Sequence, residues 1–119
     1  MKKIAIIDDV PEINTLIKKI LSSKGDYKII QYFDGKSAMS ELEEIIISDL
    51  IILDVMLPEI SGLDIYEKIK SLAPDKIKNI IFLTARGDKV DFFEDNSCKY
   101  LIKPFDPSEL LSIVESMGI

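Results

Sequence analysis

The run Leu50-Ile51-Ile52-Leu53 is apolar without interruption and ends in the acidic Asp54. A strand with one face in water alternates apolar and polar residues, whereas a strand covered on both faces is apolar throughout. Short runs of this kind recur along the chain, separated by segments with apolar residues at helical spacing. Strands that alternate with helices predict an α/β fold with a doubly wound, five-stranded parallel sheet, because each crossover is right-handed. The expected strand order is 2-1-3-4-5.

The expected strands cover residues 3–7, 28–33, 50–53, 79–83 and 100–102. Five helices are expected: from Pro11 to Gly25, after Asp34-Gly35, after Gly62, a short one within 88–94, and one from Pro107. Their apolar stripes should face the sheet. The predicted stripes are Ile13, Leu16, Ile17, Ile20 and Leu21 in the first helix, Ala38, Met39, Leu42, Ile45 and Ile46 in the second, Leu63, Tyr66, Ile69 and Leu72 in the third, and Leu110, Leu111, Val114 and Met117 in the fifth.

Length and composition favour one domain, residues 1–119, because 119 residues with 47% hydrophobic content support one core. The net charge of −6 and the lack of a basic run predict no direct nucleic-acid binding, since affinity for phosphate backbones comes from clustered Lys and Arg. No apolar stretch approaches the roughly 20 residues of a membrane span, so we expect a cytoplasmic protein without membrane insertion. The absence of histidine and the single Cys98 argue against zinc sites and Ser-His-Asp chemistry.

Three carboxylates follow strands of the predicted sheet: Asp8 and Asp9 come after the first strand, and Asp54 ends the central one. The carboxyl ends of parallel strands lie along one edge, so these side chains should converge. An aspartate before a helix is most often a cap, but two adjacent carboxylates cannot both cap one helix, and three together repel one another unless a cation is present. Their oxygens suit Mg²⁺, especially if the ion also holds a phosphoryl group, better than Ca²⁺, which favours a ligand-rich loop.

Two more polar residues are expected at the same edge. Lys103 follows the fifth strand and can point toward Asp54, where its ammonium would neutralise a phosphoryl oxygen. Thr84 offers a hydroxyl group, and the small Ala85 leaves its own backbone N–H accessible to an anion. Taken alone, Lys103 would be interpreted as a surface lysine and Thr84 as an ordinary strand residue.

Four motifs at these strand ends together resemble the receiver domain of bacterial response regulators, over the whole chain. They are Ile7-Asp8-Asp9, Asp54-Val55-Met56-Leu57-Pro58 with Gly62, Thr84-Ala85-Arg86-Gly87, and Lys103-Pro104-Phe105. The fold expected above coincides with the flavodoxin-like fold of that family. Because the chain ends at the fifth helix, we expect a stand-alone regulator similar to the single-domain proteins of chemotaxis and sporulation. A receiver cut from a larger DNA-binding transcriptional regulator is the alternative.

The resemblance implies a role in two-component phosphorelay signalling. A sensor histidine kinase, or a histidine phosphotransfer protein, would pass a phosphoryl group to the protein in a Mg²⁺-dependent reaction. The chain would be a phosphoprotein that catalyses its own phosphorylation and slow dephosphorylation, not an enzyme acting on other molecules. The resemblance implies that Asp54 is the phosphoacceptor, aided by Lys103 and Thr84, with Ala85 as a backbone contact to the phosphoryl group. It implies that Mg²⁺ is bound by Asp54, by Asp9 directly, by Asp8 directly or through water, and by the backbone carbonyl of Met56. Met56 and Arg86 would flank the positions that tune dephosphorylation.

Tyr100 matches the switch aromatic of the family. By resemblance, phosphorylation would draw Thr84 inward and let Tyr100 fill the vacated space, changing the surface of the fourth helix, fifth strand and fifth helix that a downstream protein target recognises. A half-buried strand tyrosine is the plain alternative. The segment between Thr84 and Lys103 is shorter than usual, and Asn96-Ser97-Cys98-Lys99 replaces a common Gly-Ala pair. We therefore expect a fourth helix that is short, shifted or partly unwound.

Three rival interpretations fit the sequence less well. A phosphatase of the haloacid dehalogenase type would need a second acid two residues after the nucleophile, where Met56 stands. A flavin or nucleotide carrier needs a loop rich in Gly, Ser or Thr after the first strand, whereas Asp8-Asp9-Val10-Pro11-Glu12 would repel phosphate. A receiver that binds partners without phosphorylation is disfavoured by the intact set of site residues.

Overall fold

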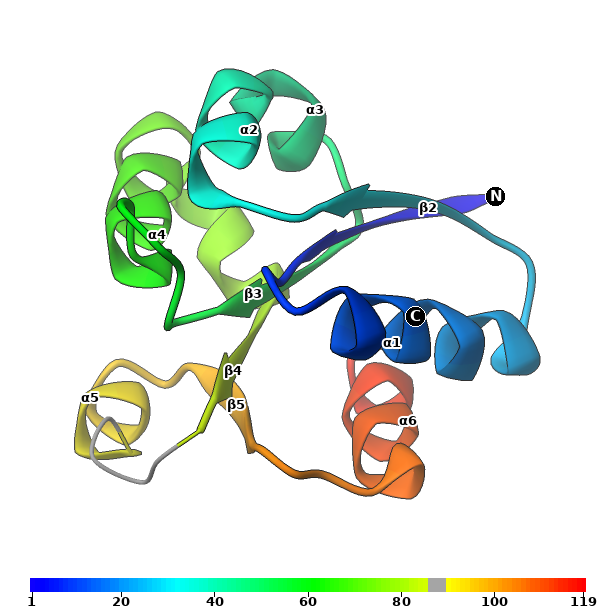
Figure 1. Cartoon of the computed structure of the whole chain (residues 1–119). Coiled ribbons are helices and arrows are strands. Elements are labelled where there is room, and N and C mark those ends of the chain that lie inside the picture. Colours follow the sequence, from blue (N-terminus) through cyan, green and yellow to red (C-terminus); the bar gives the residue numbers. More distant parts are fainter. Residues whose placement is uncertain (86–89) are drawn as a thin grey trace.

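The structure is a computed structural model that describes residues 1–85 and 90–119. Its centre is a five-stranded sheet in which every neighbouring pair is parallel (Figure 1). The strand order β2-β1-β3-β4-β5 confirms the predicted doubly wound, flavodoxin-like topology. The strands are β1 (Lys2–Ile7), β2 (Tyr27–Tyr32), β3 (Leu50–Asp54), β4 (Ile80–Thr84) and β5 (Lys99–Ile102).

Helices cover both faces of the sheet (Figure 1). They are α1 (Pro11–Lys24), α2 (Gly35–Ser40), α3 (Leu42–Ile46), α4 (Gly62–Leu72), the 3-10 helix η1 (Pro74–Asn79), α5 (Val90–Asp95) and α6 (Pro107–Ser116). α1 and α6 lie on one face, and α2, α3, α4 and α5 lie on the other. Within the described residues, no helix combines the length and the apolar character that crossing a membrane requires.

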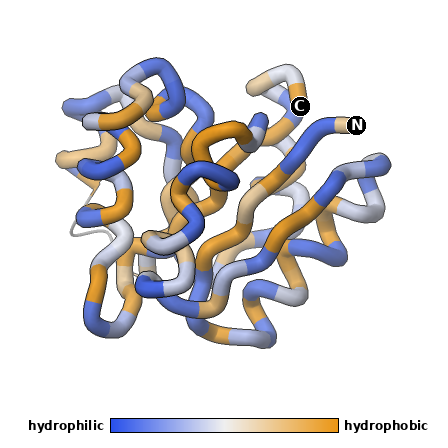
Figure 2. Tube along the Cα trace, turned by 90° about the horizontal axis from the view of Figure 1, so that it is seen from above, coloured by the Kyte–Doolittle hydropathy of each residue, from blue (hydrophilic) through white to orange (hydrophobic). Residues whose placement is uncertain are grey.

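The central strand β3 is buried along its whole length, as its apolar sequence predicts. Successive side chains of a strand point to opposite faces. Ile51 and Leu53 therefore pack in the cluster under α2 to α5, and Leu50 and Ile52 pack in the cluster under α1 and α6. Figure 2 shows hydrophobic segments along the strands inside the molecule and hydrophilic segments at the outer turns. The two covered faces leave the polar ends of the strands as the place where buried charge can gather.

The prediction of one continuous helix after Asp34-Gly35 was wrong in detail. The helix expected after Asp34-Gly35 is split into α2 and α3, because the backbone of Glu41 leaves helical geometry at φ −117° and ψ 29°. The break turns α3 so that Leu42 and Ile45 still reach the core, and Ile46 is only half-buried. Amphipathic spacing alone continues across such a break and therefore did not reveal it.

Leu16 and Leu72 were predicted to face the core, but they are 47% and 56% exposed. The inner face of α1 runs through Asn14, Ile17 and Leu21, and Leu16 lies beside this line. Leu72 is the last residue of α4, where the chain turns into η1, and Ile77 of η1 packs against the core there instead.

The helix expected within 88–94 appears in the described residues as α5, Val90–Asp95, and its expected start at Asp88 lies outside the described residues. Phe93 is fully buried, and Phe92 is half-buried against the same core cluster. Ser97, two residues after the end of α5, has a φ of 55°, so the chain turns sharply before β5. The described part covers six residues, and the expected short length stays a prediction because the expected start is not described.

Gly62 brings the start of α4 against the end of β3. A Cβ atom on Gly62 would lie 2.1 Å from the carbonyl oxygen of Asp54 and 2.9 Å from Cα of Val55, distances that real side chains do not reach. Both neighbours are backbone atoms, so neither can rotate away. The glycine thus permits α4 to begin directly beside Asp54.

We expect Gly62→Ala to lower the free energy of unfolding by about 3 kcal/mol, the upper end of the usual effect of overpacking. Urea unfolding followed by circular dichroism measures this. Gly25→Ala is the matched control, because a Cβ there would meet nothing closer than 3.8 Å and Gly25 has extended backbone angles that any residue adopts. Equal stability of the two variants would contradict the packing argument.

Candidate functional site

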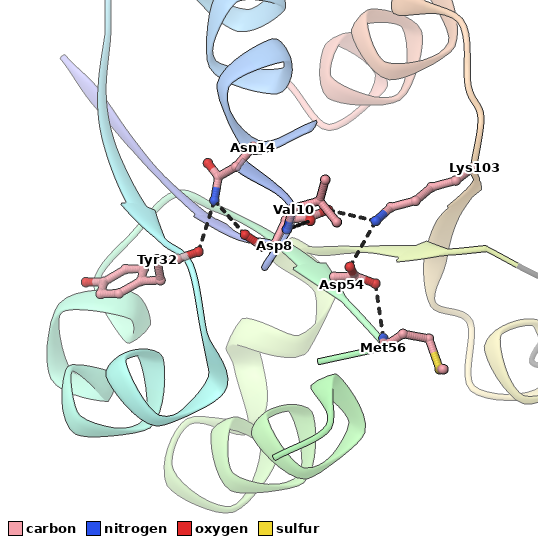
Figure 3. Close-up of polar contacts among 7 residues, drawn as sticks. All are labelled: Asp8, Val10, Asn14, Tyr32, Asp54, Met56 and Lys103. Carbon is pink, nitrogen blue, oxygen red and sulfur yellow. Dashed lines mark hydrogen bonds and ion pairs between the residues drawn. The ribbon is translucent and has the colours of Figure 1, made fainter. Parts of the chain in front are cut away.

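Three of the predicted polar residues, Asp8, Asp54 and Lys103, meet at the carboxyl edge of the sheet (Figure 3). Asp8 and Asp9 follow β1, and Asp54 is the last residue of β3. One carboxylate oxygen from each of these three residues lies within 4.8 Å of the other two. Asp8 is fully buried and Asp54 is 2% exposed, whereas Asp9 is partly exposed. The structure therefore brings together the three acids that the sequence predicted to converge.

Lys103 lies between two of these acids. Its Nζ donates hydrogen bonds to Oδ2 of Asp8 at 2.8 Å and to Oδ2 of Asp54 at 2.9 Å (Figure 3). The other carboxylate oxygens accept backbone hydrogen bonds: Oδ1 of Asp8 from the N–H of Val10 at 2.9 Å, and Oδ1 of Asp54 from the N–H of Met56 at 3.0 Å. Both buried carboxylates are thus fixed on both oxygens.

The electrostatics of the pair follow from burial and from these contacts. Burial raises the pKa of the Asp54 carboxyl, because the charged form loses water, and the hydrogen bond and charge of Lys103 offset this only in part. Burial by itself would lower the pKa of Lys103, but its hydrogen bonds to Asp8 and Asp54 outweigh burial and raise it. Lys103 therefore stays charged beside a carboxylate that is reluctant to ionise.

Thr84 and Ala85 lie at the end of the neighbouring strand. Thr84 is the last residue of β4 and is 2% exposed, and its carbonyl oxygen accepts a hydrogen bond from the N–H of Lys103 at 2.7 Å. Ala85 follows it and is exposed. Arg86, expected to flank the site, lies outside the described residues. The backbone bond ties the base of the Lys103 side chain to the strand that carries Thr84.

Met56 and Tyr100 lie at the margin of this group. The side chain of Met56 is 69% exposed, so it contributes its backbone to the site and not its thioether. Tyr100 is half-buried, its ring stacks on Phe93 with centroids 5.3 Å apart, and its hydroxyl donates to Oε1 of Glu94 at 3.2 Å. Tyr100 therefore contacts α5 in this structure and not the acids.

Asn14 was not predicted to belong to the site. It is fully buried in the first turns of α1, and its side-chain amide donates to the backbone carbonyl oxygens of Asp8 and Tyr32, each at 3.0 Å (Figure 3). The available signal was a polar residue three positions before Ile17, on the stripe that packs against the sheet. A buried amide needs hydrogen-bond partners, so such a position marks polar backbone nearby.

The donor set fits a hard divalent cation. Three carboxylates within reach of one point, with neither histidine nor thiol among them, provide the oxygen ligands that Mg²⁺ prefers. The three carboxylates also concentrate negative charge. Lys103 contributes one positive charge, which it shares between Asp8 and Asp54. Asp9, outside that ion pair and partly exposed, is open to a cation from solvent.

Comparison with known families matches residues 4–115 to the response regulator receiver domain. The chain belongs to this family. The transcriptional regulatory protein CpxR of Escherichia coli is 35% identical over 120 residues, which cover 98% of this chain and 49% of that protein. The regulatory protein VanRc of Enterococcus gallinarum is 33% identical, with 97% of this chain and 49% of that protein covered. This receiver domain thus spans about half the length of the curated relatives it matches.

Solved receiver structures have the same fold. The response regulator TrrA from Thermotoga maritima, in complex with Mg²⁺-BeF, has a TM-score of 0.84 and 32% identity, covering 98% of this chain and 99% of that one. The receiver domain of a sensor histidine kinase from Pseudomonas aeruginosa, with a magnesium ion in its active site cleft, has a TM-score of 0.81 and 29% identity, covering 99% and 98%. The protein is therefore a receiver domain of two-component signalling.

The raised pKa of Asp54 predicts how its replacement changes stability with pH in metal-free buffer. Because the folded-state pKa lies above the ordinary 3.8, raising the pH ionises Asp54 first in the unfolded chain, so the wild type loses stability relative to Asp54→Asn. The stability advantage of Asp54→Asn should grow as the pH rises from 3.8 through the folded-state pKa and stay constant above it. Urea unfolding of both proteins across this range, with EDTA present, measures the difference.

Lys103→Met sharpens the same measurement. Lys103 lowers the pKa of Asp54, so without it the advantage of the Asn substitution should go on growing to higher pH. An advantage that is independent of pH, or that shrinks as the pH rises, would contradict the assignment of burial as the dominant cause.

Proposed function

We propose that this receiver domain accepts a phosphoryl group on Asp54 from a phosphohistidine of a sensor histidine kinase or a histidine phosphotransfer protein. The observation that carries the proposal is the Lys103 ammonium, which donates at 2.8 and 2.9 Å to two buried carboxylates, one of them Asp54. A carboxylate held on both oxygens is an oriented nucleophile. The adjacent ammonium supplies charge where the oxygens of a transferred phosphoryl group would arrive.

The chemistry requires little beyond orientation and charge. One Asp54 oxygen forms a bond to phosphorus while the bond from phosphorus to the histidine nitrogen breaks, and the nitrogen keeps that electron pair. Asp54 would attack in its ionised form, so no general base is needed. Lys103 and the hydroxyl of Thr84, with the backbone N–H of Ala85, would hold the phosphoryl oxygens. The same residues would support self-catalysed phosphorylation from small phosphodonors and slow hydrolysis of the acyl phosphate.

Magnesium is part of the proposal. Asp8, Asp9, Asp54 and the backbone carbonyl of Met56 would hold Mg²⁺, which when bound supplies positive charge to the transferred phosphoryl oxygens. The oxygen-only cluster of three acids supports this, as do two similar structures described with Mg²⁺-BeF and with a magnesium ion in the active site cleft. A dehalogenase-type phosphatase lacks support, since Met56 stands where its second acid would be.

The signalling output is the second part of the proposal. Phosphorylation would change the surface formed by α5, β5 and α6 for a downstream protein target in the cytoplasm, with Thr84 and Tyr100 as the moving residues. Residues 1–119 would act as one receiver domain without binding nucleic acid directly. The curated relatives are about twice as long and include proteins named as transcriptional regulators. A receiver that controls a DNA-binding output domain is therefore the second candidate.

Incubation with acetyl phosphate and Mg²⁺ should add the mass of one phosphoryl group to the wild type, measured by intact mass spectrometry. Asp54→Asn should show no added mass, because the nucleophile is lost. Asp49→Asn is the matched control, since Asp49 lies just before the other end of the same strand and binds the N–H of Lys3. Labelling that persists in Asp54→Asn would reject Asp54 as the phosphoacceptor.

Tyr100→Ala should reduce the response of α5 to phosphorylation by more than half, because the stacked contact between Tyr100 and Phe93 is lost. Hydrogen exchange of the α5 amides, before and after treatment with acetyl phosphate, measures the response. Tyr100→Phe keeps the ring and removes only the hydrogen bond to Glu94, so it should retain the response. An unchanged response in the Ala variant would rule out the switch role of Tyr100.

A further inference from the structure

Behind the acid pair lies a buried side chain whose polar atoms are all engaged. Asn14 donates from Nδ2 to the carbonyl oxygens of Asp8 and Tyr32, and its Oδ1 accepts from Nε2 of Gln31, each at 3.0 Å. The Tyr32 carbonyl also accepts the N–H of Asp8 at 3.1 Å. The backbone of Asp8 is therefore attached to the end of β2 twice, directly through its N–H and through Asn14 at its carbonyl.

This attachment completes the fixation of Asp8. Its N–H and carbonyl are held from β2 and α1, its Oδ1 accepts from Val10, and its Oδ2 accepts from Lys103. The peptide group whose carbonyl Asn14 holds is the one that joins Asp8 to Asp9. Any rotation of that peptide would move the Asp9 carboxylate, which the structure leaves partly exposed at the site.

We infer that Asn14 is a positioning residue for the divalent cation, acting through the Asp8-Asp9 peptide, an inference that rests on the proposed Mg²⁺-dependent function. Mg²⁺ demands nearly ideal octahedral geometry, so small displacements of a carboxylate weaken its binding. Groups that orient metal ligands from behind typically contribute about 10-fold to 100-fold in metal affinity. Asn14 occupies such a place, out of contact with solvent and next to the backbone of two acids.

An amide suits this position better than other side chains. Asparagine supplies two donors and one acceptor without charge, which matches the two carbonyl oxygens and the Gln31 amide around it. Aspartate would offer no donor and would add a fourth negative charge beside the three acids. Leucine would fill a similar volume but would remove the side-chain hydrogen bond to the buried carbonyl oxygen of Asp8. Losing that bond favours a shift of the peptide.

Isothermal titration of the full chain with MgCl₂ tests the inference. Asn14→Leu should raise the Mg²⁺ dissociation constant about 10-fold relative to the wild type. Labelling by acetyl phosphate at saturating Mg²⁺ should fall much less, because the Asn14 amide bonds to the backbone of Asp8 and Tyr32 and to Gln31, and not to the reacting carboxylate. This separation of affinity from maximal rate distinguishes a positioning role from a general loss of structure.

Asn79→Leu is the matched control. The Nδ2 of Asn79 donates to the carbonyl oxygen of Asp49 at 2.7 Å, so the substitution removes the same kind of bond at the opposite edge of the sheet. It should lower stability in urea but leave the Mg²⁺ dissociation constant within about twofold of the wild type. Gln31→Leu, which removes only the bond that orients the Asn14 amide, should weaken Mg²⁺ binding in the same direction and less, and it carries the test if Asn14→Leu does not fold.

The outcomes separate the inference from the proposed function. If the wild type binds Mg²⁺ and Asn14→Leu, or Gln31→Leu in its place, binds it equally well, the inference is wrong and the proposed function stands. Equal weakening in the Asn14 and Asn79 variants would also reject it, since stability would then explain both. A wild type that binds no Mg²⁺ would overturn the inference together with the proposed metal dependence.

Discussion

One ammonium group between two buried carboxylates holds the candidate site together. Asp8 and Asp54 leave β1 and β3, and Lys103 follows β5, so the lysine reaches past the end of β4 to meet them. Neighbouring strands are about 4.8 Å apart, so β3 lies roughly two such spacings from β5, and only a long side chain spans that distance. The parallel topology puts all three residues at one edge, and burial makes each contact strong while making any unpaired carboxylate costly. The ion pair therefore stabilises a concentration of negative charge that the fold would otherwise not tolerate.

Much of this arrangement could be predicted because it depends on local patterns repeated at every strand. An apolar run such as Leu50 to Leu53 reports burial on both faces, and the polar residue that ends it reports where the strand leaves the core. Alternation of strands and helices then restricts the topology, since crossovers are right-handed and short. From those two rules Asp8, Asp54 and Lys103 must approach one another. Their convergence required no knowledge of any distance.

The parts that escaped prediction depend on contacts between segments far apart in the sequence. Asn14 looked like a polar residue on an apolar helix face, and its meaning appears only when the carbonyl oxygens of Asp8 and Tyr32 are placed against it. The break at Glu41 keeps helical spacing on both sides and leaves no periodic signature. The need for glycine at position 62 arises from the approach of α4 to the carbonyl of Asp54, which no pattern within α4 encodes. Sequence periodicity reports faces, whereas these features depend on which backbone atoms meet across them.

Aromatic packing holds the described part of helix α5 against the sheet. Phe93 anchors it: its ring stacks on Phe82 of β4 at 4.8 Å and on Tyr100 of β5 at 5.3 Å, both with planes 23° apart. Phe82 lies two residues before Thr84 on the same strand, so the anchor of α5 and the polar end of β4 share one element. Phe92 of the same helix adds an edge-on contact to Tyr66 at 6.0 Å. Because the ring of Tyr100 is part of the stack on Phe93, a displacement of Tyr100 would act directly on α5.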